Sequence, residues 1–250
     1  AGPAAVFSFG GPFMSASLYG STELKNCTVS GNTAEGGGGL ATGALGVTVA
    51  NGTTISGNSA SNGGGVLTYG YAEEFSDGGV AHSFVFYAAT NLSISTVSGN
   101  TADGKGGGVD NGDLGVTSLT RSSIMNNTAD AGGGVANCGE LSVDTCAISY
   151  NKATSKGGGL STTGGRVDVV DSIITGNLVD SPETALGGGV SSEDTILSIA
   201  RCRIALNKAR GQAAYGGGVY ALGSVVVLRD SFVIGNQADG VQADDSGGVY

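Results

Sequence analysis

The chain has 250 residues, a formal net charge of −10 and 48 glycines, which is about one fifth of the chain against a usual share of about 7%. Only 13% of the residues are charged, and no basic stripe is present that could neutralise nucleic-acid phosphates or bind an anionic membrane surface. No apolar run approaches the roughly 18 residues of a membrane span. The composition argues against nucleic acid and a direct membrane span, and suits a solvated extracellular surface.

Residues 1–20 are atypical, because four aromatic residues stand among glycines and prolines: Phe7, Phe9, Phe13 and Tyr19. We expect a degenerate first coil here, or the join to a preceding segment. The chain starts with neither an initiator methionine nor a signal peptide, and Val249-Tyr250 opens a new repeat at its other end. Because solenoids need caps, we expect the polypeptide to continue beyond residue 250.

Two motifs alternate from residue 21 onward. The first is a glycine triplet followed by valine or leucine, at Gly37–Leu40, Gly63–Val66, Gly106–Val109, Gly132–Val135, Gly157–Leu160, Gly187–Val190 and Gly216–Val219, with a partial copy at Gly247–Val249. The second is an aliphatic residue, two spacers and an asparagine; the asparagines are Asn32, Asn58, Asn100, Asn127, Asn151, Asn177, Asn207 and Asn236. Their spacing is 24 to 30 residues, with one gap of 42. A period in the twenties predicts a solenoid.

Alignment on the asparagine produces columns. Three residues before it, every copy has a β-branched aliphatic residue: Val29, Ile55, Val97, Ile124, Ile148, Ile174, Ile204 and Val233. Small residues stand five before it, and mostly aliphatic residues eight before it. Period 2 within a run predicts a strand, and the change of parity between positions eight and five predicts a corner. A helical repeat would not tolerate three glycines in every unit.

We therefore predict an all-β fold over residues 21–250, a single-stranded parallel β-helix of about eight to nine coils. Each coil would hold about three short strands and three corners, stacked at roughly 4.8 Å. The aliphatic columns would form a continuous core, and the asparagines a structural ladder of side-chain amides. A disordered glycine-rich linker is the alternative, but a linker has no reason to hold eight aliphatic residues in register.

The pairing of Gly-Gly-Gly-[Val/Leu] with [Val/Ile]-x-x-Asn resembles the repeats of right-handed parallel β-helix (pectin-lyase-like) surface proteins. It is similar to the GGA[ILV] and FxxN repeats of chlamydial polymorphic outer-membrane proteins, and closer to the "GGGIYN…TISGNTA" repeats of large secreted bacterial and algal proteins. The resemblance covers residues 10–250 and implies right-handedness and an extracellular or cell-surface location. The fold also hosts pectate lyases and polygalacturonases, so it does not decide activity. Valine or isoleucine replaces the chlamydial phenylalanine, so adhesin function does not carry over directly.

An insertion at about residues 67–91 accounts for the long gap. It contains six of the chain's 8 tyrosines and 7 phenylalanines, namely Tyr69, Tyr71, Phe75, Phe84, Phe86 and Tyr87. It also holds Glu73, Glu74, Asp77 and the only histidine, His82. Aromatic residues supply large contact areas, so this segment is a candidate interaction segment. Two structural alternatives stay open: the aromatics cover one face of the helix, or Gly78-Gly79-Val80 starts an extra coil.

The corner after the asparagine lengthens in the last coils, at residues 178–186, 208–215 and 237–246. Stacking would place these corners side by side on one edge, where insertions often form a binding face. The alternative is that surface corners tolerate extra length at little entropic cost.

Chemistry on acidic polysaccharides needs clustered carboxylates together with lysine or arginine. The charged residues weighed for this role are Asp144, Arg166, Asp168, Asp171, Arg201, Arg203, Asp230, Glu193, Asp194, Asp244 and Asp245. Asp171, Arg201 and Asp230 fit an outward ion-pair ladder better than a catalytic group. His82 has no evident partner in a motif. We therefore predict no catalytic residue, no cofactor and no metal site, since no CxxC motif or histidine cluster is present.

Three of the four cysteines, Cys27, Cys146 and Cys202, share the small inward column and lie two or more coils apart, roughly 9 to 10 Å, which exceeds disulfide reach. We expect them to be buried thiols that act as small hydrophobic residues. Cys138 and Cys146 fall in one coil, and whether they pair stays open.

Four N-x-[ST] triplets, at Asn26, Asn51, Asn91 and Asn126, are candidate N-glycosylation sites for a eukaryotic host. Together these patterns predict a structural or adhesive extracellular protein, a rigid rod segment of a larger surface or filament assembly. Its partners would be other protein chains or copies of itself, with glycans as a further candidate. The alternative is a carbohydrate-active or carbohydrate-binding β-helix.

Overall fold

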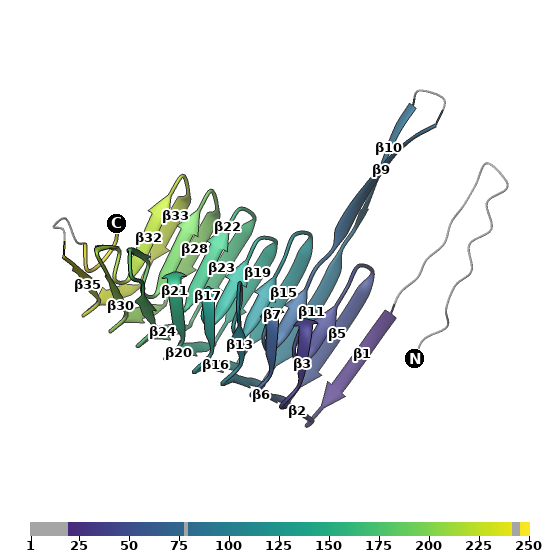
Figure 1. Ribbon diagram of the computed structural model, residues 1–250, viewed down its shortest axis with the longest axis horizontal. Helices are drawn as coiled ribbons and strands as arrows, with labels where there is room; N and C mark the ends of the chain where they lie inside the picture. Colours follow the sequence, from purple (N-terminus) through teal and green to yellow (C-terminus); the bar gives the residue numbers. More distant parts are fainter. Residues whose placement is uncertain (1–19, 78–79, 242–245) are drawn as a thin grey trace.

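The computed structural model describes residues 20–77, 80–241 and 246–250 and has the form of an elongated parallel β-solenoid (Figure 1). The regular elements of these residues are all β-strands, and the coils stack one behind another along the long axis. No helix in this part of the chain is long and apolar enough to cross a membrane. The predicted all-β solenoid is confirmed. Its two sheets that precede each asparagine contain eight strands each.

Each full coil contributes a strand to each of four parallel sheets, which we call A to D, and two coils add a second strand to sheet C. Sheet A contains β1 (Gly20–Lys25), β5 (Gly46–Asn51), β11 (Ala88–Ser93), β15 (Gly115–Thr120), β19 (Glu140–Asp144), β23 (Arg166–Val170), β28 (Ile196–Ala200) and β33 (Val225–Arg229). Sheet B contains β2 (Thr28–Ser30), β6 (Thr54–Ser56), β12 (Thr96–Ser98), β16 (Ser123–Met125), β20 (Ala147–Ser149), β24 (Ile173–Thr175), β29 (Arg203–Ala205) and β34 (Phe232–Ile234). These two sheets carry the aliphatic columns that precede each asparagine.

The other two sheets follow the asparagine and the glycine triplet. Sheet C contains β3 (Thr33–Gly36), β7 (Ser59–Asn62), β13 (Thr101–Ala102), β17 (Thr128–Ala131), β21 (Lys152–Lys156), β25 (Leu178–Asp180), β26 (Thr184–Leu186), β30 (Lys208–Gly211), β31 (Ala213–Tyr215) and β35 (Gln237–Gly240). Sheet D contains β4 (Leu40–Thr42), β8 (Val66–Thr68), β14 (Val109–Asn111), β18 (Val135–Asn137), β22 (Leu160–Thr163), β27 (Val190–Glu193) and β32 (Val219–Leu222).

The expectation of about three strands per coil is therefore wrong, because the coils have four. The glycine triplet is a corner in its own right, and the valine or leucine after it begins a separate strand of sheet D. Gly132, the first glycine of one triplet, has a φ of +65°, which L side chains rarely adopt. At Gly134, the third, an added Cβ would lie 2.6 Å from the Gly159 carbonyl oxygen and 2.8 Å from Asn151 Nδ2 of the next coil. The triplet thus combines a sharp turn with close stacking of coils.

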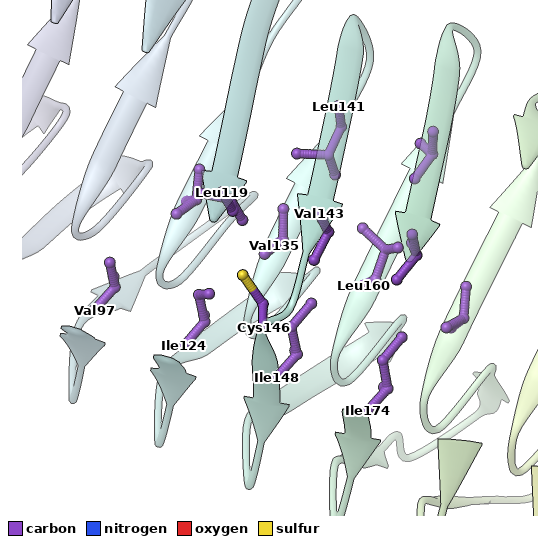
Figure 2. Close-up of a cluster of buried hydrophobic side chains, with 14 of the residues drawn as sticks. Val97, Leu119, Ile124, Val135, Leu141, Val143, Cys146, Ile148, Leu160 and Ile174 are labelled. Atoms are coloured by element: carbon purple, nitrogen blue, oxygen red, sulfur yellow. The ribbon is translucent and has the colours of Figure 1, made fainter. Parts of the chain in front are cut away.

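The interior holds stacked aliphatic side chains from sheets A, B and D. Figure 2 shows Val97, Ile124, Ile148 and Ile174 in a row, one in each of four successive coils of sheet B. All four side chains are fully buried, as the column alignment predicts. Burial of each such side chain is worth roughly 1.5 to 3 kcal/mol, so this repeated core is the main source of stability.

The eight asparagines form a continuous ladder at the corner between sheets B and C. In the middle of the ladder, Asn127 Nδ2 donates to Asn151 Oδ1 at 3.0 Å and to the Val97 carbonyl oxygen at 3.0 Å. Its Oδ1 accepts from both the backbone N and the Nδ2 of Asn100, each at 3.0 Å. Asn127 therefore uses its whole amide, although the side chain is buried. The same amide-to-amide bond links each successive pair from Asn32 to Asn236.

A second buried polar ladder lies at the corner between sheets D and A. It joins threonine hydroxyls and asparagine amides from Thr42, Thr48, Thr90, Thr68, Thr117, Asn111, Asn137, Thr162 and Thr195. Its three tightest links, each at 2.7 Å, are Thr42 to Thr48, Thr68 to Thr90 and Asn111 to Asn137. Part of this ladder is visible in the sequence, since a threonine or asparagine stands two residues after the valine or leucine in five triplet copies. The columns aligned on the asparagine do not reveal it.

The cysteines are all free thiols, so Cys138 and Cys146 do not form a disulfide. Cys146 and Cys202 are buried as expected, whereas Cys27 of the first coil is partly exposed. The expectation that they act as hydrophobic residues is incomplete, because Cys146 Sγ accepts from the backbone N of Ser122 at 3.4 Å. In turn Ser172 Oγ accepts from the backbone N of Cys146 at 2.9 Å. Thiols and hydroxyls thus alternate in one ladder.

Candidate functional site

The insertion forms an antiparallel hairpin that leaves the solenoid at the corner between sheets D and A (Figure 1). Its strands are β9 (Tyr71–Asp77) and β10 (Val80–Phe86), paired only with each other, and residues 78–79 lie outside the described ones. Neither structural alternative from the sequence is correct. Val80 continues the hairpin rather than a new coil, and the ribbon extends away from the body instead of covering a face. Tight antiparallel pairing from Tyr71 and Phe86 outward explains this geometry.

Aromatic side chains gather at the base of the hairpin. The ring centroids of Tyr71 and Phe86 are 4.9 Å apart, and those of Phe84 and Phe86 are 6.4 Å apart. Tyr71 is 46% exposed, Phe84 47% and Tyr87 57%, and Tyr69 next to the hairpin is similarly exposed. Exposed aromatic side chains of this kind are enriched at protein interfaces. Phe75 lies opposite His82 in the strand register, but both side chains are outside the described part of the chain.

The lengthened corners stack on one another as predicted. Within them β26 pairs with β31, and Ala185 and Ala214 of these strands are fully buried in a second small core with Ala153, Val179 and Ala209. The extra length therefore widens sheet C and buries apolar surface. The two clefts described in this structure are lined by other residues.

Five of the charged residues weighed for catalysis are held in ion pairs, namely Arg166 with Asp168, Arg201 with Asp171, and Glu193 with Lys156. Arg166 Nε lies 2.8 Å from Asp168, and Arg201 Nε lies 2.7 Å from Asp171. The hydrogen bonds from Arg201 lower the pKa of the Asp171 carboxyl. Among the described residues Arg201 has its ion pair with Asp171 alone, so the expected ladder is half formed, and Asp230 acts on Arg201 only over a longer range. Residues 244 and 245 lie outside the described ranges.

A polar cavity that the sequence analysis did not anticipate lies on the outer side of sheet D. Its volume is about 230 Å³, and its lining residues are Asn62, Lys105, Asp110, Gly112, Asp113 and Cys138. Asp110 points outward from β14 yet is only 5% exposed, and a Cβ added at Gly106 would lie 2.7 Å from its Cα. One carboxylate oxygen, Oδ1, is buried without a hydrogen-bond partner in the described chain. Lys105 Nζ lies 3.9 Å from Cys138 Sγ at the same cavity.

Burial raises the pKa of the Asp110 carboxyl to about 6, with a smaller lowering by Lys105 and a further raising by Asp113. An acid that titrates near neutrality beside a lysine and a second carboxyl is typical of acid–base sites and also of strained structural groups. A sequence signal for Asp110 exists. The position after the triplet's valine or leucine holds small or apolar residues and one tyrosine in the other coils, so a lone aspartate there is unusual.

We expect Asp110→Asn to remove the loss of stability that the wild type suffers when the pH rises. The native state holds the Asp110 proton more tightly than the unfolded chain, where the pKa is 3.8. The free energy of unfolding therefore falls as pH rises from about 4 to about 6, by roughly 3 kcal/mol for this group. In urea denaturation at pH 4 and pH 7.5, the free energy of unfolding of the variant should rise relative to that of the wild type only at the higher pH. Asp103→Asn, which removes an exposed carboxylate from the same coil, is the control and should show no such gain.

The four candidate glycosylation asparagines, Asn26, Asn51, Asn91 and Asn126, are all exposed. Asn26 and Asn126 occupy corners with φ of 51° and 55°. Their side chains are therefore accessible to a modifying enzyme, whereas the ladder asparagine Asn127 is fully buried.

Comparison with family models, with curated proteins and with solved structures finds no match to this chain. In the described ranges no group of three or more histidine, cysteine or acidic side chains could hold a metal ion.

Proposed function

We propose that the protein is a rigid rod segment of an extracellular or cell-surface assembly, and that the β9–β10 hairpin makes its contacts with other chains. Three buried ladders and a continuous aliphatic core support the rod role, since they fix the coils against bending or slipping. The acidic, lysine-poor composition and the four exposed sequons support a location outside the cell.

The observation that carries the proposal is the hairpin. A two-stranded ribbon is marginally stable by itself in water, and this one exposes aromatic side chains instead of burying them against the coils. The solenoid does not need it, because the other corners between sheets D and A close with a few residues. A feature that costs stability and projects from a uniform rod is best explained by a partner that covers it.

Replacing residues 71–86 by two glycines should abolish assembly or adhesion while leaving the solenoid folded. Gly70 is hydrogen bonded through its backbone N to Asp113 O at 2.9 Å, and Ala88 N to Leu114 O at 3.3 Å, so both ends of the cut stay anchored in the coil. Circular dichroism and thermal melting report the fold, and sedimentation velocity with a cell-surface binding assay reports the function.

A matched control is replacement of residues 181–183, an exposed turn in another corner, by glycines, which should change neither readout. Unchanged assembly in the hairpin variant would contradict the assigned role of the hairpin. Loss of the β spectrum would mean that the hairpin is needed for folding, and would contradict it as well.

A second candidate function, binding or cleavage of carbohydrate, has one observation in its favour, the Asp110 cavity. We expect no turnover of polygalacturonate, alginate or similar acidic glycans, with or without calcium. Reducing-end release measured across pH 4 to 8 tests this expectation. Turnover that Asp110→Asn abolishes, and Asp103→Asn leaves intact, would establish the enzyme and overturn the structural role.

A further inference from the structure

The outer face of sheet B carries an apolar and basic strip on its last coils. Ile173, Arg203 and Phe232 are direct neighbours in the register of β24, β29 and β34, and all three face outward. Phe232 is 69% exposed. Side chains that point outward in a solenoid are not covered by the next coil, so this strip stays exposed when coils stack.

A shallow groove continues the strip toward the earlier coils. Its volume is about 380 Å³, and it follows the corner between sheets A and B. The small residues Thr96, Ser123 and Ala147 form its floor, in the same register column as Ile173. Exposed Ile94 and Ile173 stand at its ends. We call the groove and the strip together the sheet B face.

The charge of the sheet B face is opposite to that of the hairpin. No acidic side chain in the described part of the chain lies within ion-pair distance of Arg121, which lines the groove, or of Arg203. Asp171, the one acid in the groove, is paired with Arg201. The hairpin segment 71–86 contains three acidic residues and no lysine or arginine. The hairpin is aromatic and acidic, whereas the sheet B face is apolar and basic. The two surfaces are therefore complementary.

The length of the hairpin also matches the length of the sheet B face. A strand of seven residues, as in β9 and β10, is about 24 Å long. From Thr96 in β12 to Phe232 in β34 the column crosses five coil steps, which is about 24 Å at the usual strand spacing. The hairpin can therefore lie along the whole column.

We propose that the hairpin of one copy docks on the sheet B face of a second copy, so that the chains associate head to tail. This inference rests on the proposed role of the hairpin in assembly. The hairpin precedes β11 whereas the groove follows it, and in Figure 1 the hairpin points away from the body, so one chain does not reach its own groove. Pairing of two hairpins would bring like charges together. Because donor and acceptor are different surfaces, the contact repeats along an open filament or closes into a ring.

Two variants test this arrangement. The donor variant lacks residues 71–86, and the acceptor variant carries Arg121→Glu and Arg203→Glu. In sedimentation velocity we expect the wild type to form a concentration-dependent series of oligomers that shrinks at 1 M salt, where the screening length is about 3 Å. Each variant alone should stay monomeric. An equimolar mixture should form a 1:1 heterodimer and nothing longer, because it contains one intact donor and one intact acceptor.

Arg229→Glu, the same charge reversal at an exposed position of sheet A, is the matched control and should assemble like the wild type. Adding Glu73→Arg and Glu74→Arg to the acceptor variant should restore self-association. An acceptor variant that assembles normally would overturn the sheet B face while leaving the hairpin's role intact. Assembly by the donor variant would overturn both proposals, and a wild type that stays monomeric at all concentrations would overturn self-association in favour of a different partner protein.

Discussion

Ile148→Asp should prevent the solenoid from folding. Ile148 is fully buried in the sheet B column, between Ile124 and Ile174 of the adjacent coils. An aspartate there would bury a carboxyl with no charged or polar partner in an aliphatic stack, which costs several kcal/mol in addition to the lost burial. That total is comparable to the whole stability of a typical domain, which is about 5 to 15 kcal/mol.

Circular dichroism and urea denaturation measure the effect. The matched control is Ala147→Asp, which places the same charge one residue earlier on the outward side of the same strand. Because side chains alternate along a strand, the control should melt close to the wild type. An Ile148→Asp variant with a normal β spectrum and an unchanged melting temperature would show that the column does not face inward.

Asn151→Leu should destabilise the fold by about 3 kcal/mol, because the change breaks the ladder at its centre. Asn151 Oδ1 accepts from the backbone N and the Nδ2 of Asn127, both at 3.0 Å. Its Nδ2 donates to Asn177 Oδ1 and to the Ile124 carbonyl oxygen, again at 3.0 Å. Leucine has the same branching at Cγ but offers none of these bonds, and the groups it leaves without a partner are buried away from water.

The control is the same substitution at Asn32, which is exposed in the first coil and whose side chain makes one such bond, from its Nδ2 to Asn58 Oδ1 at 2.9 Å. Asn32→Leu should cost less than half as much, as measured by urea denaturation at pH 7. Equal effects at the two positions would mean that the loss reflects local strand propensity and not the ladder.

The sequence predicts much of this fold because the same positions are buried in every coil. An inward position must be aliphatic every time the chain passes it, so Val97, Ile124, Ile148 and Ile174 recur with the period of the coil. The stacked asparagines recur for the same reason, since a buried amide needs an identical neighbour above and below to satisfy it. These constraints repeat in every coil, which is why the solenoid and the positions of the core columns could be read before any coordinates.

Other features leave no repeated signal. The hairpin occurs once, and its antiparallel pairing depends on contacts between Tyr71 and Phe86 that spacing alone does not reveal. Asp110 shares its cavity with Lys105 of its own coil and with Asn62 and Cys138 of the neighbouring coils, and no single column of the sequence shows this grouping. The sheet B face combines side chains from six coils, and outward positions are free to vary because no neighbour must match them. The sequence by itself therefore determined the inside of this protein, while only the tertiary structure decided its outer surfaces, where contacts between distant segments set burial, charge and shape.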